Sequence, residues 1–256
     1  MRYPGGSYYS TSSFSVRPGV KWLLIANTAI FVLYYLAAIF GVGSLFAPFR
    51  LVPEQTVEGL RVWQPLTYLF LHDPSGFSHI LLNMLSLFMF GNTLEETWGT
   101  DLFLRFYFIC GAGAGLCVIL AGYATAMPFV PTIGASGAIF GLLVAFGMLF
   151  PDATVLFSFL FPIKAKYMVM IIGGITFLSS LQVNSGVSHI AHLGGMLFGF
   201  LLLKTPQGQS VLYREPGLSP SRRWNRFWAE YKLRRARKRF QVYMSKQNRK
   251  NGPYVN

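Results

Sequence analysis

A serine flanked by glycines is the first candidate for chemistry in this chain of 256 residues. Gly134-Ala135-Ser136-Gly137 stands where a loop turns into an apolar run that ends near Phe150. Glycines let backbone amides approach a substrate, and the first amides of a helix are unpaired donors at the positive end of its dipole. A nucleophilic Ser136 would therefore have oxyanion donors beside its hydroxyl. The structural alternative is a small-residue helix start with Ser136 as its N-cap.

Two further pairs of polar residues stand at the beginnings of apolar segments. His79 and Asn83 are spaced i, i+4 and share one helix face, and His189 and His192 are spaced i, i+3. Ionisable groups inside apolar spans are candidates for function, although each histidine also has the simpler interpretation of a satisfied polar group at an interface. Whether either pair lies near Ser136 therefore depends on how the helices pack.

Glycine spacing predicts which helices approach each other. Gly137 and Gly141 are four residues apart in the segment that Ser136 opens, and Gly195 and Gly199 repeat that spacing after His192. Two helices with such glycine faces can pack closely, which would bring the serine next to a histidine. A serine beside a histidine is a nucleophile–base dyad.

The remaining residues of this candidate site are assigned by position. No acidic residue lies near His192 in the sequence, so packing would have to orient its imidazole, and Phe140 is one helical turn after Ser136 and can stack on it. His79 and Asn83 can donate hydrogen bonds to a developing oxyanion together with the Ser136 amide.

Composition shows what kind of protein must position these groups. Hydrophobic residues make up 53% of the chain and charged residues only 12%, which is too apolar for an ordinary soluble domain. Several uncharged runs approach the length that spans a bilayer. The sequence predicts an all-α polytopic membrane protein with six transmembrane helices at about 22–41, 79–94, 102–123, 136–150, 167–181 and 189–203. Because the fourth is short, its serine end should lie below the membrane surface.

The connection at 42–78 is long enough to have structure or function of its own. Its leucine, phenylalanine and tryptophan residues, with few charges, indicate a segment lying in the membrane interface. His72, beside Asp73, is interpreted as a polar group of that interface.

The sequence predicts no metal or other cofactor. It has no His-Glu-x-x-His pattern, and its four histidines lack a carboxylate at ligand spacing. Cys110 and Cys117 are interpreted as reduced packing residues, because they lie in one apolar run without a Cys-x-x-Cys pattern.

The formal charge of +13 is concentrated after the last apolar segment, where fourteen lysines and arginines face two glutamates. The positive-inside rule then places both termini in the cytoplasm. The sequence divides into a cytoplasmic tail at 1–21, a six-span domain at 22–203 and a basic cytoplasmic tail at 204–256. We expect this basic tail to bind anionic lipids. The alternative is a helix docked on the cytoplasmic face, and no motif supports nucleic-acid binding.

Three motifs together resemble the rhomboid intramembrane serine proteases. They are Gly134-Ala-Ser-Gly137, His79-Ile-Leu-Leu-Asn83 and Ala191-His-Leu-Gly-Gly195, in the family's order on the fourth, second and sixth predicted spans. The resemblance covers about 22–203. It implies Ser136 as nucleophile, His192 as general base and His79 and Asn83 as oxyanion donors. Gly134 and Phe140 support the site, and Gly195 and Gly199 form the close-packing face.

Two positions depart from that family's pattern. Many members have Trp-Arg in the first loop where this chain has Trp63-Gln64, and a tyrosine often stacks on the catalytic histidine where Phe140 stands. The first departure bears on how the loop is anchored, and the second keeps the ring and loses a hydroxyl.

The resemblance implies a serine endopeptidase of a bacterial inner membrane that cleaves transmembrane segments of other proteins. The alternatives are a non-catalytic rhomboid-like protein that binds membrane clients, and a channel or transporter, for which inverted repeats would be expected. The sequence does not indicate an oligomeric state.

Overall fold

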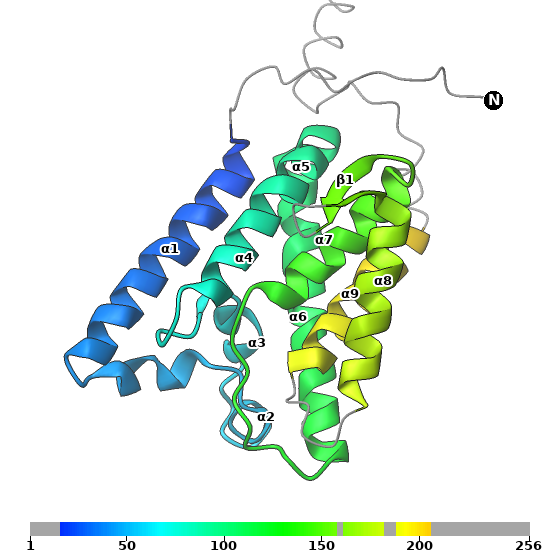
Figure 1. Ribbon diagram of the computed structural model, residues 1–256. Coiled ribbons are helices and arrows are strands. Elements are labelled where there is room, and N and C mark those ends of the chain that lie inside the picture. Colours follow the sequence, from blue (N-terminus) through cyan, green and yellow to red (C-terminus); the bar gives the residue numbers. More distant parts are fainter. Residues whose placement is uncertain (1–15, 158–160, 182–187, 206–256) are drawn as a thin grey trace, which may run out of the picture. The chain divides into compact units, whose positions relative to one another are not determined.

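The computed structural model describes residues 16–157, 161–181 and 188–205 (Figure 1). The predicted tails at 1–15 and 206–256 lie outside the described residues. In chain order the elements are α1 (Pro18–Ile39), the 3₁₀ helix η1 (Gly43–Phe49), α2 (Pro53–Val57), α3 (Gln64–Thr67), the 3₁₀ helix η2 (Tyr68–Phe70), α4 (Ser78–Ser86), the π-helix η3 (Leu87–Gly91), α5 (Asn92–Trp98), α6 (Thr100–Ala124), α7 (Ser136–Leu149), β1 (Thr154–Phe157), β2 (Phe161–Lys164), α8 (Ala165–Ser180) and α9 (Ser188–Lys204).

Each of the six predicted apolar segments is helical. The last four agree with the prediction to within two residues at each end, whereas the first helix begins at Pro18 instead of at residue 22. The second segment is α4, η3 and α5 in succession, so a π-helical turn interrupts it and it extends to Trp98. By length and composition α1 and α6 could each cross a membrane, and the apolar helices α7, α8 and α9 are shorter.

The early start of α1 is explained by a buried carboxylate. Pro18 is a favourable first helical residue because its fixed φ suits the helix and its missing N–H needs no partner. The next two amides, of Gly19 and Val20, donate to the two oxygens of Glu95, each at 2.8 Å. Glu95 is buried and therefore neutralises the positive end of the α1 dipole from inside the protein.

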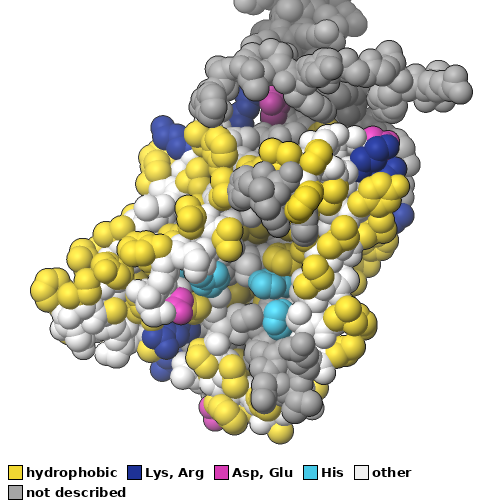
Figure 2. All heavy atoms as spheres, viewed as in Figure 1, with side chains coloured by type: hydrophobic (Ala, Val, Ile, Leu, Met, Phe, Trp, Pro, Cys, Tyr) yellow, Lys and Arg dark blue, Asp and Glu magenta, His cyan; other side chains and the backbone are white. Residues whose placement is uncertain are grey.

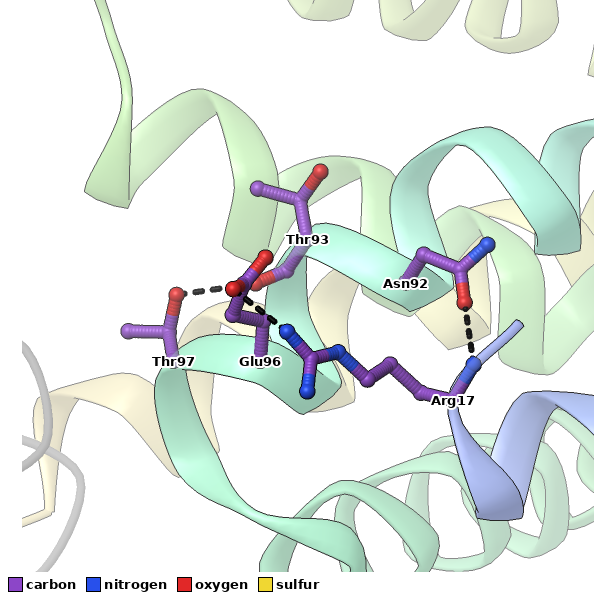
Figure 3. A network of polar contacts seen from close by, with 5 residues as sticks. All are labelled: Arg17, Asn92, Thr93, Glu96 and Thr97. Atoms are coloured by element: carbon purple, nitrogen blue, oxygen red, sulfur yellow. Dashed lines mark hydrogen bonds and ion pairs between the residues drawn. The ribbon is translucent and has the colours of Figure 1, made fainter. Parts of the chain in front are cut away.

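Residues near Glu95 in sequence make further contacts with the start of α1 at the surface (Figure 3). The backbone N–H of Arg17 donates to Asn92 Oδ1 at 2.9 Å, and its guanidinium pairs with Glu96. The Thr97 hydroxyl donates back to the Thr93 carbonyl at 2.8 Å. The beginning of α1 is thus held against α5.

Helix α7 is the centre of the packed core. It lies against α6 and α9, and ten of its fourteen residues are buried. A helix buried on all sides is apolar all round, as this one is. Fourteen residues rise only about 21 Å, less than the roughly 30 Å of a hydrocarbon core. Helix α8 lies at the margin of the core, and only Ala165, Met168 and Thr176 of its residues are buried.

The long connection between α1 and α4 folds into the short helices η1, α2, α3 and η2, as its length suggested. It is joined to the segment that precedes α7. Leu51 and Thr132 exchange two backbone hydrogen bonds of 3.0 and 2.8 Å, and the Glu54 N–H donates to the Pro128 carbonyl at 2.9 Å. The loop and the approach to Ser136 are therefore one substructure.

The prediction that the fold is all-α misses one element. β1 and β2 form an antiparallel hairpin in which Thr154 pairs with Lys164 and Phe157 with Phe161. At its base, Asp152 accepts hydrogen bonds from Lys164 and Lys166 at 3.1 and 3.0 Å. β-Branched and aromatic residues favour strands, and both strands contain them, but each strand has only four residues and gives a weak signal in the sequence.

Candidate active site

Ser136 is the first residue of α7 and follows a tight turn. Gly134 has φ of +124°, which is unfavourable for residues with a side chain, and its N–H donates to the Tyr68 carbonyl at 2.9 Å. A Cβ on Gly134 would lie 3.0 Å from His79 Nε2 and 3.7 Å from Ser136 Oγ. Glycine is thus required both by the backbone and by the side chains that close in on the turn.

The serine hydroxyl meets a histidine of the last helix. Ser136 Oγ and His192 Nε2 are 2.7 Å apart, and both side chains are partly buried. With the imidazole proton on Nδ1, the serine O–H donates to Nε2, which is the arrangement a general base needs.

Glycines make this contact possible. A Cβ on Gly195 would lie 1.8 Å from the Gly137 carbonyl oxygen, and one on Gly199 would lie 2.8 Å from that of Gly141. Side chains cannot occupy such distances, so α7 and α9 approach backbone to backbone. The glycine spacing had predicted this helix pair.

The ring of His192 is oriented by packing. Phe140 stacks on it with ring centroids 4.1 Å apart and planes inclined by only 3°. Within the described residues the ion pairs involve Arg17, Lys164 and Lys166, and none involves a histidine. Phe140 therefore supports the imidazole from its face, whereas the acidic residue of a triad accepts a hydrogen bond in the plane of the ring.

The two predicted oxyanion donors differ in their placement. The partly buried ring of His79 lies beside the Gly134 turn, close to Ser136. Asn83 is buried one turn further along α4, and its Nδ2 donates to the His79 carbonyl at 2.8 Å. One of the two amide hydrogens of Asn83 is thus used within its own helix.

Comparison with known proteins shows which family the chain belongs to. The Rhomboid domain matches residues 59–205, which is more than half of the chain. The chain belongs to the Rhomboid family. Its members are typically intramembrane serine proteases, and some relatives bear the name rhomboid-like.

Curated relatives come from bacteria, plants and fungi. YdcA of Bacillus subtilis, which is assigned to the rhomboid proteases, is 37% identical over 144 residues, 55% of this chain and 65% of the relative. RHOMBOID-like protein 12, mitochondrial, of Arabidopsis thaliana is 29% identical over 194 residues, 71% of this chain and 56% of the relative. Rhomboid protein 1, mitochondrial, of Saccharomyces cerevisiae is 31% identical over 161 residues, 58% of this chain and 43% of the relative. The chain thus spans less than two thirds of the length of each of these relatives.

The connection between α1 and α4 is anchored by Gln64, at the position where many rhomboid proteases resemble one another in having an arginine. Gln64 is fully buried, and its Oε1 accepts hydrogen bonds from the Val52 N–H at 3.0 Å and the Thr56 hydroxyl at 2.8 Å. Its Nε2 donates to the Pro48 carbonyl at 3.2 Å, which also accepts from Trp63 Nε1 at 3.0 Å. A neutral amide with both donors and acceptors therefore organises this loop.

Two histidines complete the surroundings of the site. Figure 2 shows histidine side chains at the surface in two groups on one face of the protein. His189 lies perpendicular to His192 with ring centroids 6.2 Å apart. His72, interpreted from the sequence as an interfacial group, is instead fully buried with its ring 5.1 Å from that of His79. His72 lies in the loop before α4, so helical periodicity could not show that it meets His79.

Proposed function

We propose that this rhomboid protein is an intramembrane serine endopeptidase that cleaves transmembrane segments of other membrane proteins through a dyad of Ser136 and His192. The observation that carries the proposal is the distance of 2.7 Å between Ser136 Oγ and His192 Nε2. A serine and a histidine at hydrogen-bond distance on two helices locked by glycines form a preorganised nucleophile and base.

The dyad would act in two steps. His192 Nε2 takes the proton as Ser136 Oγ attacks the scissile carbonyl, and the imidazolium then protonates the leaving amine as the peptide C–N bond breaks. Water, deprotonated by His192, hydrolyses the acyl ester and restores the serine. The Ser136 amide, His79 and Asn83 would stabilise the oxyanion in both steps.

The wider arrangement follows from the same proposal. Residues 22–203 would form a six-span catalytic domain, with 1–21 and 204–256 as cytoplasmic tails in the plasma membrane of a bacterium. The basic tail would bind anionic lipids. Because a helical carbonyl is hydrogen-bonded, substrates should contain small, glycine or proline residues that weaken the helix near the cleaved bond.

A fluorophosphonate probe tests the proposal directly. Such a probe reacts with an activated serine, so it should label the purified wild-type protein and spare Ser136→Ala. Ser136→Ala and His192→Ala should each abolish cleavage of a transmembrane substrate, and the double variant should be no worse than either, because the pair acts as a unit. His189→Ala should keep most of the activity. Equal labelling of wild type and Ser136→Ala would favour a non-catalytic rhomboid-like protein.

A further inference from the structure

His72 is a buried polar side chain that the proposed mechanism does not use. It has no exposed surface, and neither ring nitrogen makes a hydrogen bond within the described part of the chain. The carbonyl of Phe70 lies near the ring but outside hydrogen-bond geometry. Leaving a buried polar group unpaired destabilises the folded state, so proteins rarely keep such a group without a reason.

The surroundings of His72 leave it neutral. Its neighbour Asp73 is exposed and accepts the Ser75 N–H at 2.9 Å, and the guanidinium of Arg50 donates to the Tyr34 hydroxyl. Neither group pairs with the ring. Burial, followed by the proximity of His79, lowers the pKa of His72 to about 4. A neutral imidazole offers one donor and one acceptor nitrogen.

His72 contacts His79, whose ring lies beside the turn at Gly134. The centroids of His72 and His79 are 5.1 Å apart, with planes inclined by 59°. His79 Nε2 would lie 3.0 Å from a Cβ on Gly134, which is close to Ser136. A hydrogen bond on one imidazole nitrogen fixes the tautomer and the orientation of the other nitrogen. Hydrogen bonds of this kind are often long in a resting site and tighten in the transition state.

We propose that His72 is a positioning residue, whose buried imidazole donates to His79 Nδ1 as the oxyanion forms and so presents His79 Nε2–H to it. This inference rests on the proposed function and assigns the loop before α4 a part in the reaction. His72 touches no reacting atom; it acts through His79.

The test is His72→Phe, which removes both ring nitrogens and keeps an aromatic ring at this position. His72→Phe should lower kcat about ten-fold with KM unchanged, less than the roughly 10²–10³ of a lost oxyanion donor, because His79 remains. Its Tm should be equal to or above that of the wild type, since two unpaired buried nitrogens are removed. His72→Gln, which keeps a donor and an acceptor, should recover part of the loss. In a background of His79→Ala, His72→Phe should have no further effect on kcat.

The outcomes separate this inference from the proposed function. A wild-type protein that neither cleaves nor reacts with the probe contradicts the proposed function itself. If the wild type is active and the kcat of His72→Phe is within two-fold of the wild-type value, the inference alone is overturned. It is also overturned if His72→Phe lowers kcat as much in the His79→Ala background as it does in the wild type. If His72→Phe does not fold, His72→Gln decides: a Tm below wild type with unchanged kcat shows a structural role and overturns the inference.

Discussion

An aromatic ring orients His192, whereas a carboxylate orients the histidine of a serine protease triad. A carboxylate stabilises the imidazolium that forms during attack and fixes its tautomer, whereas the face of Phe140 holds the ring by stacking at 4.1 Å. Aromatic pairs of this kind contribute about 0.5–1.5 kcal/mol beyond the area that they bury. The dyad thus depends on packing for its orientation, which suits an apolar environment in which a buried carboxylate would be costly.

At the same scale, the two oxyanion donors should differ in importance. We expect His79→Ala to reduce kcat by about 10²–10³, because its ring lies beside Ser136, and Asn83→Ala to reduce it less, because its Nδ2 already donates within α4. The measurement is kcat of both variants on one substrate in the same detergent, with thermal unfolding as the folding control. Equal losses would mean that the two side chains contribute alike, and a larger loss for Asn83→Ala would assign the main side-chain donor to Asn83; either result contradicts the prediction.

The sequence predicted which residues could form the site, but not how the loop contributes. Ser136, His192 and Phe140 stand on helices, where period and glycine spacing report which faces meet. His72 and Gln64 stand in a loop, where burial depends on contacts made by distant segments. No local pattern could therefore show that both are fully buried.

At the scale of helices, the contact between α7 and α9 is set by the absence of side chains. Gly195→Ala would place a Cβ 1.8 Å from the Gly137 carbonyl oxygen, so the helices must separate and Ser136 must move from His192. We expect a clearly lower Tm and a loss of at least about 10²-fold in activity, the effect of a displacement near 1 Å. Gly174→Ala in α8 is the matched control, because its Cβ would meet nothing within 4 Å.

The comparison of Gly195→Ala with Gly174→Ala tests whether the close approach of α7 and α9 is required. Gly174→Ala should leave Tm and activity near those of the wild type, since the only change is a better helix former at an open position. A wild-type rate in Gly195→Ala would mean that the dyad tolerates a wider helix pair than the structure has.

The start of α1 depends on a second kind of contact, between a helix end and a side chain. Glu95→Ala should lower stability strongly, because two buried amides lose their acceptor at about 1–3 kcal/mol each. Glu96→Ala removes an ion pair whose side chains are 41% and 66% exposed, and such pairs contribute about 0–1 kcal/mol. Thermal unfolding of the two variants in one detergent compares them. A smaller loss for Glu95→Ala would mean that water replaces its carboxylate at the helix end.

The bounds of the helices show which parts of the fold could be predicted from the sequence. Long apolar runs made α6, α7, α8 and α9 predictable to within two residues, because length and hydropathy alone define them. The π-helix η3 and the hairpin β1–β2 were not predicted. Each depends on tertiary packing that a short segment of sequence does not record.

For the whole molecule, charge and helix length together predict a topology. Helix α6 rises about 38 Å over its 25 residues, more than the roughly 30 Å of a hydrocarbon core. It starts beside the Arg17 end of the protein and finishes where the Tyr123 hydroxyl donates to Glu58 at 2.9 Å. Figure 1 shows the start of α1, α5 and the hairpin β1 at one end of the helices, with α2 at the other. Lys164 and Lys166 lie with that hairpin, so from the positive-inside rule we expect this end to lie in the cytoplasm.

Cysteine accessibility measures this assignment. We expect Glu58→Cys to react with a membrane-impermeant maleimide in intact cells, and Lys166→Cys to react only after the membrane is opened. Both side chains are at the surface, and native Cys110 is buried while Cys117 is partly buried, so the unmodified protein provides the background. Reversed labelling would place the basic end outside and contradict the charge argument. Labelling of both cysteines in intact cells would mean that α6 does not separate the two ends across the bilayer, and the six-span arrangement would then be wrong.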